Sequence, residues 1–233
     1  MNLLSLETSS QDVSIAVFKN EDILLEYNFS SRDNLSAMLV PSLEFVLKSL
    51  DLSMGNIDLF GVGIGPGLFT GIRIGLATLK GVAFAEKKPL VGVTSLMALA
   101  FKFVDTEKNV ISLIDAKKGE VYLGGYRFMG GEPVELIPPC LLKINDIVPL
   151  LEKFPDKIFT GSGAEKHKDF LVHHFSGSRQ LNRSHFLANE IGMIAWQQFR
   201  RKRYLTNLQS LSPFYLRKPD AESNLAVSNA ILD

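Results

Sequence analysis

The stretch with the clearest potential for chemistry is a glycine-rich loop, GVGIGPGLFTGIRIG, at residues 61–75. Glycine-rich loops that lead into a helix often bind phosphate through backbone N–H groups. A Walker A loop needs a Lys followed by Ser or Thr after its last Gly, and this stretch has neither. A dinucleotide-binding loop needs G-x-G-x-x-G, whereas GPGLFTG has one residue too many before its last Gly. The loop therefore fits neither kind of phosphate site.

The same glycines fit a structural purpose. Gly65 and Gly67 flank Pro66, a combination typical of a tight turn at the end of a strand. Gly71 and Gly75 lie four residues apart, so they share one face of a helix. Small residues at that spacing allow another backbone to approach closely. This pattern predicts a close packing contact at the start of the helix.

The helix that follows the loop, at residues 71–86, is poor in charge. Thr70 is placed to cap it, and Arg73 and Lys80 are its only charged residues before Glu86. A helix on one side of a sheet needs an apolar stripe of only about 100°. We therefore expect burial on two sides, by a sheet and by another helix or subunit. A helix wholly inside its own chain is the alternative.

Residues for metal or nucleophilic chemistry are sparse. The histidines fall at 167, 173, 174 and 185, and no two are four residues apart. Two histidines at i and i+4 would share a helix face and could bind a metal, so their absence predicts no metal site. The single cysteine, Cys140, has no histidine near it in sequence and is expected to be a buried, inert thiol. We therefore expect neither catalytic residues nor metal ligands.

The bulk composition excludes several classes of protein. The chain has 233 residues, with 25 Lys and Arg against 25 Asp and Glu, so the formal net charge is zero. A protein that binds nucleic acid unaided usually has a basic excess. The densest basic run, FRRKR at 199–203, is interpreted as a solvated helix end, with RNA or partner contact as the alternative. No stretch approaches the roughly 18 apolar residues of a membrane span, and MNLLSLETSS does not resemble a signal peptide. We expect a cytoplasmic protein with no membrane partner.

Hydrophobic periodicity predicts two α/β lobes, residues 1–107 and 108–233. Each is expected to start with strands joined by a tight turn and to continue with alternating helices and strands. The last long helix, FLANEIGMIAWQQFRRKR, is expected to pack back on the first lobe. The tail LSPFYLRKPDAES is expected to be extended.

Several segments, in this order, resemble the TsaB (YeaZ) family: LLSLETSSQDVSIAVF, GVGIGPGLFTGIRIGLATLKGVAF, PLVGVTSLMALA, IDAKKGEVYLGGY and the tail PFYLR. The resemblance implies an actin/Hsp70/sugar-kinase (ASKHA) fold with two lobes of ribonuclease-H-like type. It implies a non-catalytic subunit for making N6-threonylcarbamoyladenosine (t6A) at position 37 of tRNA. The implied partners are TsaD, which it would bind and activate, and TsaE, with tRNA bound only through the complex. No cofactor is implied, except a nucleotide at the interface with the partner.

The ASKHA fold places phosphate against one turn in each lobe, and both turns are altered here. The first, ETSSQ at residues 7–11, has no glycine, and the second, DAKKGE at 115–120, has no early glycine pair. The candidates for remnant nucleotide contacts are Glu7, Thr8, Ser9, Asp115, Gly161, Gly163 and Arg73. A small-molecule kinase that uses Glu7, Thr8 and Asp115 is the first alternative function. A metalloprotease-like protein is the second.

The helices at residues 36–50 and 71–86 are expected to lie side by side and to pair with matching helices of TsaD. Without TsaD, the same surface is expected to form a homodimer, because apolar patches of that size are rarely left in water. The residues predicted to form this interface are Leu39, Leu43, Leu47, Gly71, Gly75, Thr78 and Val82.

Overall fold

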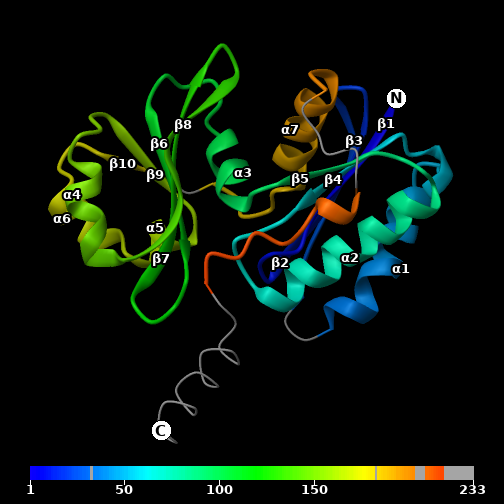
Figure 1. Ribbon diagram of the computed structural model, residues 1–233, viewed down its shortest axis with the longest axis horizontal. Coiled ribbons are helices and arrows are strands. Elements are labelled where there is room, and N and C mark those ends of the chain that lie inside the picture. Colours follow the sequence, from blue (N-terminus) through cyan, green and yellow to red (C-terminus); the bar gives the residue numbers. More distant parts are fainter. Residues whose placement is uncertain (32–33, 182, 203–207, 218–233) are drawn as a thin grey trace, which may run out of the picture.

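The computed structural model describes residues 1–31, 34–181, 183–202 and 208–217, and it contains two five-stranded sheets with helices on their faces (Figure 1). The strand orders are β3-β2-β1-β4-β5 and β10-β9-β6-β7-β8. In each sheet the first three strands in sequence are antiparallel neighbours, and the two later strands add in parallel. This repeated topology confirms the prediction of two similar α/β lobes.

The first sheet consists of β1 (Asn2–Glu7), β2 (Asp12–Lys19), β3 (Asp22–Ser30), β4 (Leu59–Gly63) and β5 (Leu90–Val93). The second consists of β6 (Asn109–Asp115), β7 (Glu120–Met129), β8 (Glu132–Lys143), β9 (Lys157–Thr160) and β10 (Arg179–Gln180). The α-helices are α1 (Leu35–Lys48), α2 (Phe69–Ala85), α3 (Ser95–Phe101), α4 (Ile147–Leu151), α5 (Ser162–Lys166), α6 (Lys168–His174) and α7 (Ala188–Arg200). Short 3-10 helices span Met54–Asn56, Ile144–Asp146 and Leu208–Ser210.

The elements stack in five layers, which can be followed across Figure 1. Helices α1 and α2 cover one face of the first sheet. Helices α3 and α7 fill the space between the two sheets, and α4, α5 and α6 cover the far face of the second. Strands β1 and β2 are apolar on both sides because both faces of the first sheet are covered. The lobes therefore share the apolar layer that contains α3 and α7.

Two β-strand serines fix the start of α7. The Ser14 hydroxyl accepts hydrogen bonds from the backbone N–H groups of Leu187 and Ala188, at 3.0 and 2.9 Å. The Ser5 hydroxyl donates to the Ala188 carbonyl at 2.6 Å. The first N–H groups of a helix have no partner within the helix, so the buried Ser14 hydroxyl from the sheet replaces a conventional cap.

Strand β8 was not predicted from the sequence. Its sequence, EPVELIPPCLLK, contains three prolines, which normally argue against a strand. The sheet order explains how they fit, because β8 is an edge strand and needs only one side for ladder hydrogen bonds.

The predicted cap at Thr70 is wrong. Helix α2 begins two residues earlier than expected, with Leu68 at its N-cap and no side-chain hydrogen bond there, so Thr70 is not a cap. Helix α3 is capped by Thr94, whose hydroxyl accepts from the Met97 N–H at 3.3 Å. Ser95 is left available for the contact described below.

Residues 211–217, here called the strap, cross from the first lobe to the second without regular secondary structure. Lys80 of α2 donates to the Leu211 carbonyl at 2.8 Å, and the Phe214 N–H donates to the Ile64 carbonyl at 2.8 Å. At its other end, Arg217 donates to the Ala116 carbonyl at 2.6 Å and contacts Glu120. The tail was predicted to be extended, and its residues from 218 on lie outside the described part. Within the described residues, no helix is both long and apolar enough to cross a membrane.

Candidate functional site

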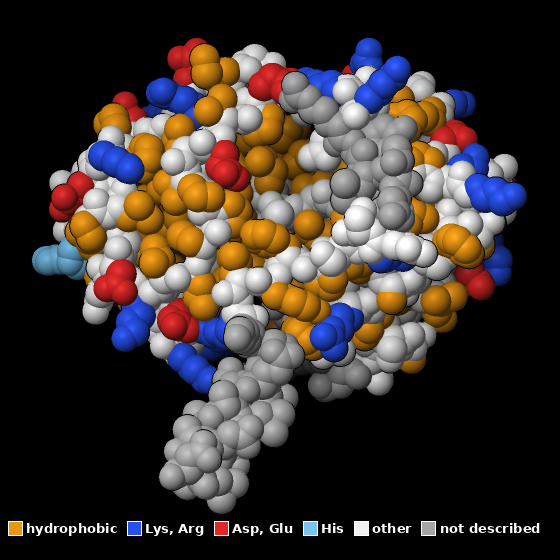
Figure 2. All heavy atoms as spheres, viewed as in Figure 1, with side chains coloured by type: hydrophobic (Ala, Val, Ile, Leu, Met, Phe, Trp, Pro, Cys, Tyr) orange, Lys and Arg blue, Asp and Glu red, His pale blue; other side chains and the backbone are white. Residues whose placement is uncertain are grey.

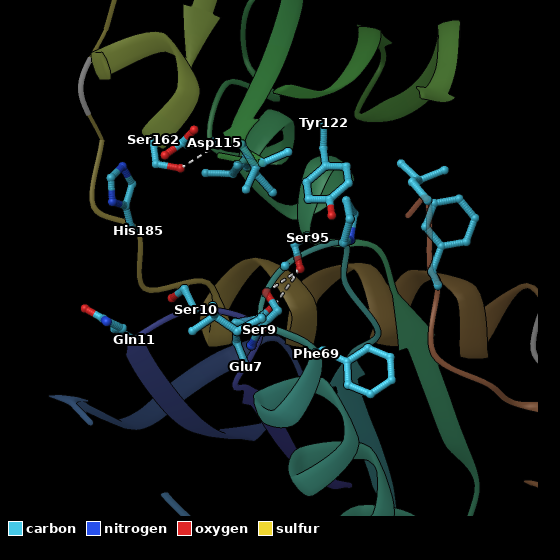
Figure 3. Close-up of a pocket in the computed structure, with 18 of the residues that line it drawn as sticks. Glu7, Ser9, Ser10, Gln11, Phe69, Ser95, Asp115, Tyr122, Ser162 and His185 are labelled. Carbon is cyan, nitrogen blue, oxygen red and sulfur yellow. Dashed lines mark hydrogen bonds between the residues drawn. The ribbon is translucent and has the colours of Figure 1, made fainter. Parts of the chain in front are cut away.

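A cleft of about 550 Å³ lies between the lobes. Figure 3 shows its polar residues from both sides: Glu7, Ser9 and Gln11 from the first lobe, Asp115 and Ser162 from the second, and His185 at one end. The ring of Tyr122 extends from β7 toward Ser95, and the strap residues Phe214–Arg217 also line the cleft. This volume lies within the range of small-molecule sites in proteins. The structure therefore brings together Glu7, Ser9 and Asp115, three of the residues predicted from the sequence.

Glu7 closes the floor of the cleft. Its carboxylate accepts hydrogen bonds from the Ser9 N–H and, at 3.1 Å, from the Ser95 hydroxyl, which is itself 2.8 Å from the Ser9 hydroxyl. Complete burial raises the pKa of Glu7 above its ordinary value, although these hydrogen bonds oppose the shift. Gly63 leaves the necessary room, because a Cβ there would lie 2.2 Å from the Glu7 carboxylate.

The glycine-rich loop packs directly on this turn. The Leu68 N–H donates to the Ser9 carbonyl at 2.6 Å, and a Cβ on Gly67 would lie 2.1 Å from the same oxygen. The loop therefore needs glycine to approach the β1–β2 turn. It supports the floor of the cleft through contacts within the chain.

Asp115 is held by its own lobe. Lys166 donates to its carboxylate at 2.9 Å, the Lys117 N–H donates at 3.0 Å, and the Lys117 ammonium lies 3.1 Å away. Partial burial acts to raise the pKa of Asp115, but the hydrogen bonds from Lys166 and Lys117 outweigh it and hold the pKa below its ordinary value. Asp115 is therefore an ionised, fully paired carboxylate at the start of the turn between β6 and β7.

These two turns do not fit a nucleoside polyphosphate, the ligand that the fold family implies. Phosphate binding in such turns uses backbone N–H groups that point into the cleft. Here the Ser9 N–H donates to Glu7 and the Lys117 N–H donates to Asp115. Each turn thus supplies its own carboxylate in place of a ligand anion, and those carboxylates would repel a phosphate chain.

Four predicted nucleotide contacts do not line the cleft. The Thr8 hydroxyl donates to the Gly71 carbonyl at 2.9 Å, facing α2. Gly161 and Gly163 pack on β6, where a Cβ on either would lie 2.4 Å and 3.0 Å from Leu113 backbone atoms. Arg73 is on the outside of α2, against aromatic side chains. The structure therefore places these four residues away from the cleft, and the two glycines serve close packing between neighbouring elements.

Two parts of the cleft were not anticipated. His185 lies between carboxylates of both lobes, with its Nε2 at 3.2 Å from Glu165 and its Nδ1 at 3.9 Å from Asp12. The strap supplies an aromatic wall through Phe214 and Tyr215. The aromatic tail PFYLR was the available signal for the second feature, but sequence alone does not say which surface such a tail contacts. Within the described ranges, no three His, Cys, Asp or Glu side chains form a group that could hold a metal ion.

The predicted interface residues turn mostly inward, which is a correction. Leu39, Leu43 and Leu47 are 1, 1 and 3% exposed and belong to the core between α1, α2 and the first sheet. Gly71 and Gly75 do allow a close approach, but the approaching residue is Thr8 of the same chain. A Cβ on either would lie 2.0 or 2.1 Å from Thr8 atoms.

Other residues of the same helices face outward. Thr78 and Val82 are half-buried, and Val82 also packs against the core. Large apolar side chains of α1 and α2 are exposed instead: Met38, Val40, Phe45 and Phe84. Helix α2 is thus neither wholly internal nor buried on two sides within the chain. Its exposed side also carries the small residues Ala77, Gly81 and Ala85.

The basic run at the end of α7 is paired within the chain. Arg200 forms an ion pair with Glu21 at 3.1 Å, and Arg201 pairs with Glu132. Arg203 lies outside the described residues. Because Arg200 and Arg201 already have acidic partners, this end of α7 has the character of a solvated helix end.

Comparison with known proteins shows which family this chain belongs to. A family model described as "TsaD: tRNA N6-adenosine threonylcarbamoyltransferase" matches residues 29–225. A Bacillus subtilis (strain 168) protein named tRNA threonylcarbamoyladenosine biosynthesis protein TsaB is 25% identical over 229 residues, which cover 96% of this chain and 97% of the relative. The chain belongs to the TsaB (YeaZ) group of this family.

Solved structures agree with the TsaB assignment. The structure titled "YeaZ from Pseudomonas aeruginosa" superimposes with a TM-score of 0.76 at 25% identity, covering 92% of this TsaB-group chain and 99% of that one. A ROK hexokinase from Thermus thermophilus has a TM-score of 0.54 at 12% identity, over 86% of this chain and 100% of the hexokinase. The second likeness concerns the fold alone and confirms the ASKHA architecture.

Proposed function

We propose that this chain is the TsaB subunit of the machinery that forms t6A at position 37 of tRNA, and that it acts by binding and activating TsaD. The observation that carries the proposal is the similarity, over nearly the whole chain, to a relative named for t6A biosynthesis. The cleft supports a non-catalytic role, because one N–H group of each turn, that of Ser9 or Lys117, donates to a carboxylate of the same turn.

The outward face of α1 and α2 is the proposed TsaD-binding surface. Phe45 and Phe84 are 57 and 77% exposed, and Met38 and Val40 add apolar area on α1. In the view of Figure 2, apolar side chains are exposed along α2. Exposed apolar groups gathered on two adjacent helices are typical of a surface that another protein covers. TsaD, whose family model matches this chain, is expected to present corresponding helices.

The remaining parts of the proposal follow from the same assembly. Without TsaD, the outward face of α1 and α2 would pair with a second copy of the chain about a two-fold axis. Thr78 and Val82 would lie at the edge of that surface. TsaE and tRNA would join through the complex, and any nucleotide would bind at the interface with the partner. The complex would work in the cytoplasm, with no cofactor bound by this chain alone.

Reconstitution with TsaD and TsaE tests the proposal. The three proteins are supplied with tRNA and the threonylcarbamoyl donor, and t6A is measured by nucleoside mass spectrometry with and without this chain. We expect t6A only when the chain is present. Phe45→Asp and Phe84→Asp should abolish TsaD binding and t6A formation because they place charge in an apolar interface. Val172→Asp is the matched control, since Val172 is 59% exposed on α6 in the other lobe.

Three results would contradict the proposal. The first is t6A formation by TsaD and TsaE at the same rate without this chain. The second is a strict monomer, in size-exclusion chromatography with light scattering, that ignores added TsaD. The third is tight binding of magnesium and ATP by the isolated chain in isothermal titration, which would favour the small-molecule kinase.

A further inference from the structure

Arg73, on the exposed side of α2, is held in place by aromatic residues from two distant segments. Its guanidinium carbon lies 3.7 Å from the centroid of the Phe69 ring. Its Nε donates to the Tyr215 hydroxyl at 2.9 Å. Tyr215 of the strap stacks on Phe69 with ring centroids 4.6 Å apart and an angle of 22° between the planes. The helix and the strap together fix the plane of the guanidinium.

The outer N–H groups of this guanidinium have no carboxylate partner among the residues that the structure describes. Arg200, Arg201 and Arg217 each contact a glutamate of the same chain. Within the same described ranges, Arg73 forms its hydrogen bond with Tyr215 and its ring contacts with Phe69 and Tyr215. The stack and the Nε hydrogen bond leave both Nη groups available as donors. Arg73 is therefore an exposed cation with its orientation already set.

A fixed guanidinium is well suited to a carboxylate. Its two parallel N–H donors match the two carboxylate oxygens, and the bidentate pair is stronger than a neutral hydrogen bond. Ordering the side chain before binding reduces the entropy lost when the contact forms. Leu68 and Tyr215, which are 48 and 38% exposed, provide apolar surface next to Phe69 that a partner would also cover.

The position of Arg73 on α2 indicates the partner. Arg73, Ala77, Gly81 and Phe84 follow one another at helical spacing, and all are exposed. Arg73 therefore begins the stripe on α2 proposed above as the TsaD-binding surface. We infer that the Arg73 guanidinium binds an Asp or Glu carboxylate of TsaD, an inference that rests on the proposed function.

The local charge favours a protein carboxylate over a tRNA phosphate. Phosphate backbones are usually bound by clustered Lys and Arg residues. On α2 the only other charged residue is Lys80, whose ammonium donates to the Leu211 carbonyl at 2.8 Å. Arg73, which has no acidic partner in the part of the chain that the structure describes, lies in an otherwise apolar stripe and matches the Arg-containing anchors of protein interfaces.

The affinity of the full chain for TsaD, measured by isothermal titration, tests the inference. We expect Arg73→Ala and Arg73→Lys each to raise the dissociation constant by about tenfold or more, because Lys keeps the charge but loses the planar fork. Arg127→Lys is the matched control: Arg127 is exposed on β7, its Nε donates to the Glu107 carbonyl at 2.9 Å, and we expect no change in affinity. Thermal unfolding of each variant checks that the fold is intact.

A charge exchange separates direct contact from an indirect effect through the strap. If Arg73 meets a carboxylate, Arg73→Glu should bind one TsaD variant, with an interface Asp or Glu changed to Arg, more tightly than it binds unmodified TsaD. The inference would be overturned if no Asp or Glu to Arg change at the TsaD interface restored binding to Arg73→Glu. So would an Arg73→Lys variant that binds as tightly as the unmodified chain.

Two further outcomes keep the inference and the proposed function distinguishable. If the unmodified chain binds TsaD and the Arg73 variants bind equally well, the inference is wrong while the proposed function stands. A loss of tRNA affinity by the assembled complex, with unchanged TsaD affinity, would show a phosphate ligand and also overturn the inference. If the unmodified chain does not bind TsaD at all, both fall together.

Discussion

At Gly71, a single added methyl group would collide with the turn between β1 and β2. An added Cβ would lie 2.0 Å from the Thr8 carbonyl oxygen, which is backbone and cannot rotate away. Helix α2 or the β1–β2 turn would have to shift. We expect Gly71→Ala to lower the free energy of unfolding by about 2–3 kcal/mol, as overpacking at a tight contact does. Urea denaturation measures the change.

Gly81 is the matched control for Gly71 because it lies on the same helix with nothing within 4 Å of an added Cβ. Gly81→Ala should raise the free energy of unfolding by about 0.5–1 kcal/mol, since alanine is the better helix former. If both substitutions had the same effect, the close packing of α2 on Thr8 would be wrong.

Glu7 should make stability depend on pH. Burial raises the pKa of the folded Glu7 above its ordinary value of 4.5, so the folded state holds its proton more tightly than the unfolded state does. The stability contributed by this group is complete below pH 4.5 and is lost as pH rises through the folded pKa. Glu7→Gln should therefore be more stable than the unmodified chain at pH 8, with the difference closing toward pH 4.

Melting temperatures across this pH range would measure the effect, at about 2–4 °C for each kcal/mol in a chain of this length.

Asp58→Asn is a control of opposite sign. The Asn2 N–H donates to the Asp58 carboxylate at 2.9 Å and lowers its pKa below the ordinary 3.8. Its contribution is present above pH 3.8 and is lost as pH falls through the folded pKa, so Asp58→Asn should destabilise at neutral pH. If the melting temperature of Glu7→Gln changed with pH in parallel with that of the unmodified chain, burial of ionised Glu7 would not be destabilising.

Helices α3 and α7 are joined by an ion pair at their junction. The Lys102 ammonium lies 3.0 Å from the Glu190 carboxylate, and the side chains are 11 and 10% exposed. Lys102→Met would leave the buried Glu190 carboxylate without a positively charged partner. We therefore expect a loss of about 3–5 kcal/mol in the free energy of unfolding. The double variant Lys102→Met/Glu190→Leu should regain most of that loss, because neither charge then remains.

The surface pair between Lys48 and Glu44 is the control, with side chains 78 and 60% exposed. Lys48→Met should change stability by less than about 0.5 kcal/mol, since exposed pairs are screened by solvent. Chemical denaturation of the unmodified chain and the three variants compares the two pairs. An equal cost for Lys102→Met and Lys48→Met would show that the junction is solvated.

Elements with strong periodicity were predictable from sequence. The apolar run of β1 and the spacing of α7 each indicated one structure. Strand β8 was not, because Pro133, Pro138 and Pro139 mask it and only the sheet order shows that it lies at an edge. Local sequence carries no information on which strand ends a sheet.

Most residues predicted to form the interface are buried against their own chain, while other residues of the same two helices are exposed. Helix α1 buries Leu39 and Leu43 but exposes Val40 and Phe45, which lie on different flanks of the helix. A helix that is apolar on both sides gives no signal for which side packs on its own sheet. Similarly, Glu7 and Asp115 were placed correctly in the cleft by their turns. Their hydrogen bonds to N–H groups of the same turns could not be predicted from the sequence, because they depend on the exact conformation of each turn.

For the whole molecule, the layer between the sheets decides how independent the lobes are. The core around α3 and α7 contains Leu3 and Phe18 of the first sheet together with Tyr126 and Ile158 of the second. The strap adds a second connection through Arg217 and Ala116. Neither sheet can expose its inner face without exposing apolar residues of the other lobe.

We therefore expect the chain to unfold as one unit. In calorimetry it should show a single transition whose calorimetric and van't Hoff enthalpies agree. The fluorescence of Trp196, on α7 against the first sheet, should change at the same midpoint as hydrogen exchange in β6 and β9 of the second lobe. A fragment of residues 1–107 should not fold, because it lacks α7, which covers one face of its sheet. Two separate transitions, or a folded fragment, would mean that each lobe has a sufficient core of its own and that the apolar layer between the sheets contributes little to stability.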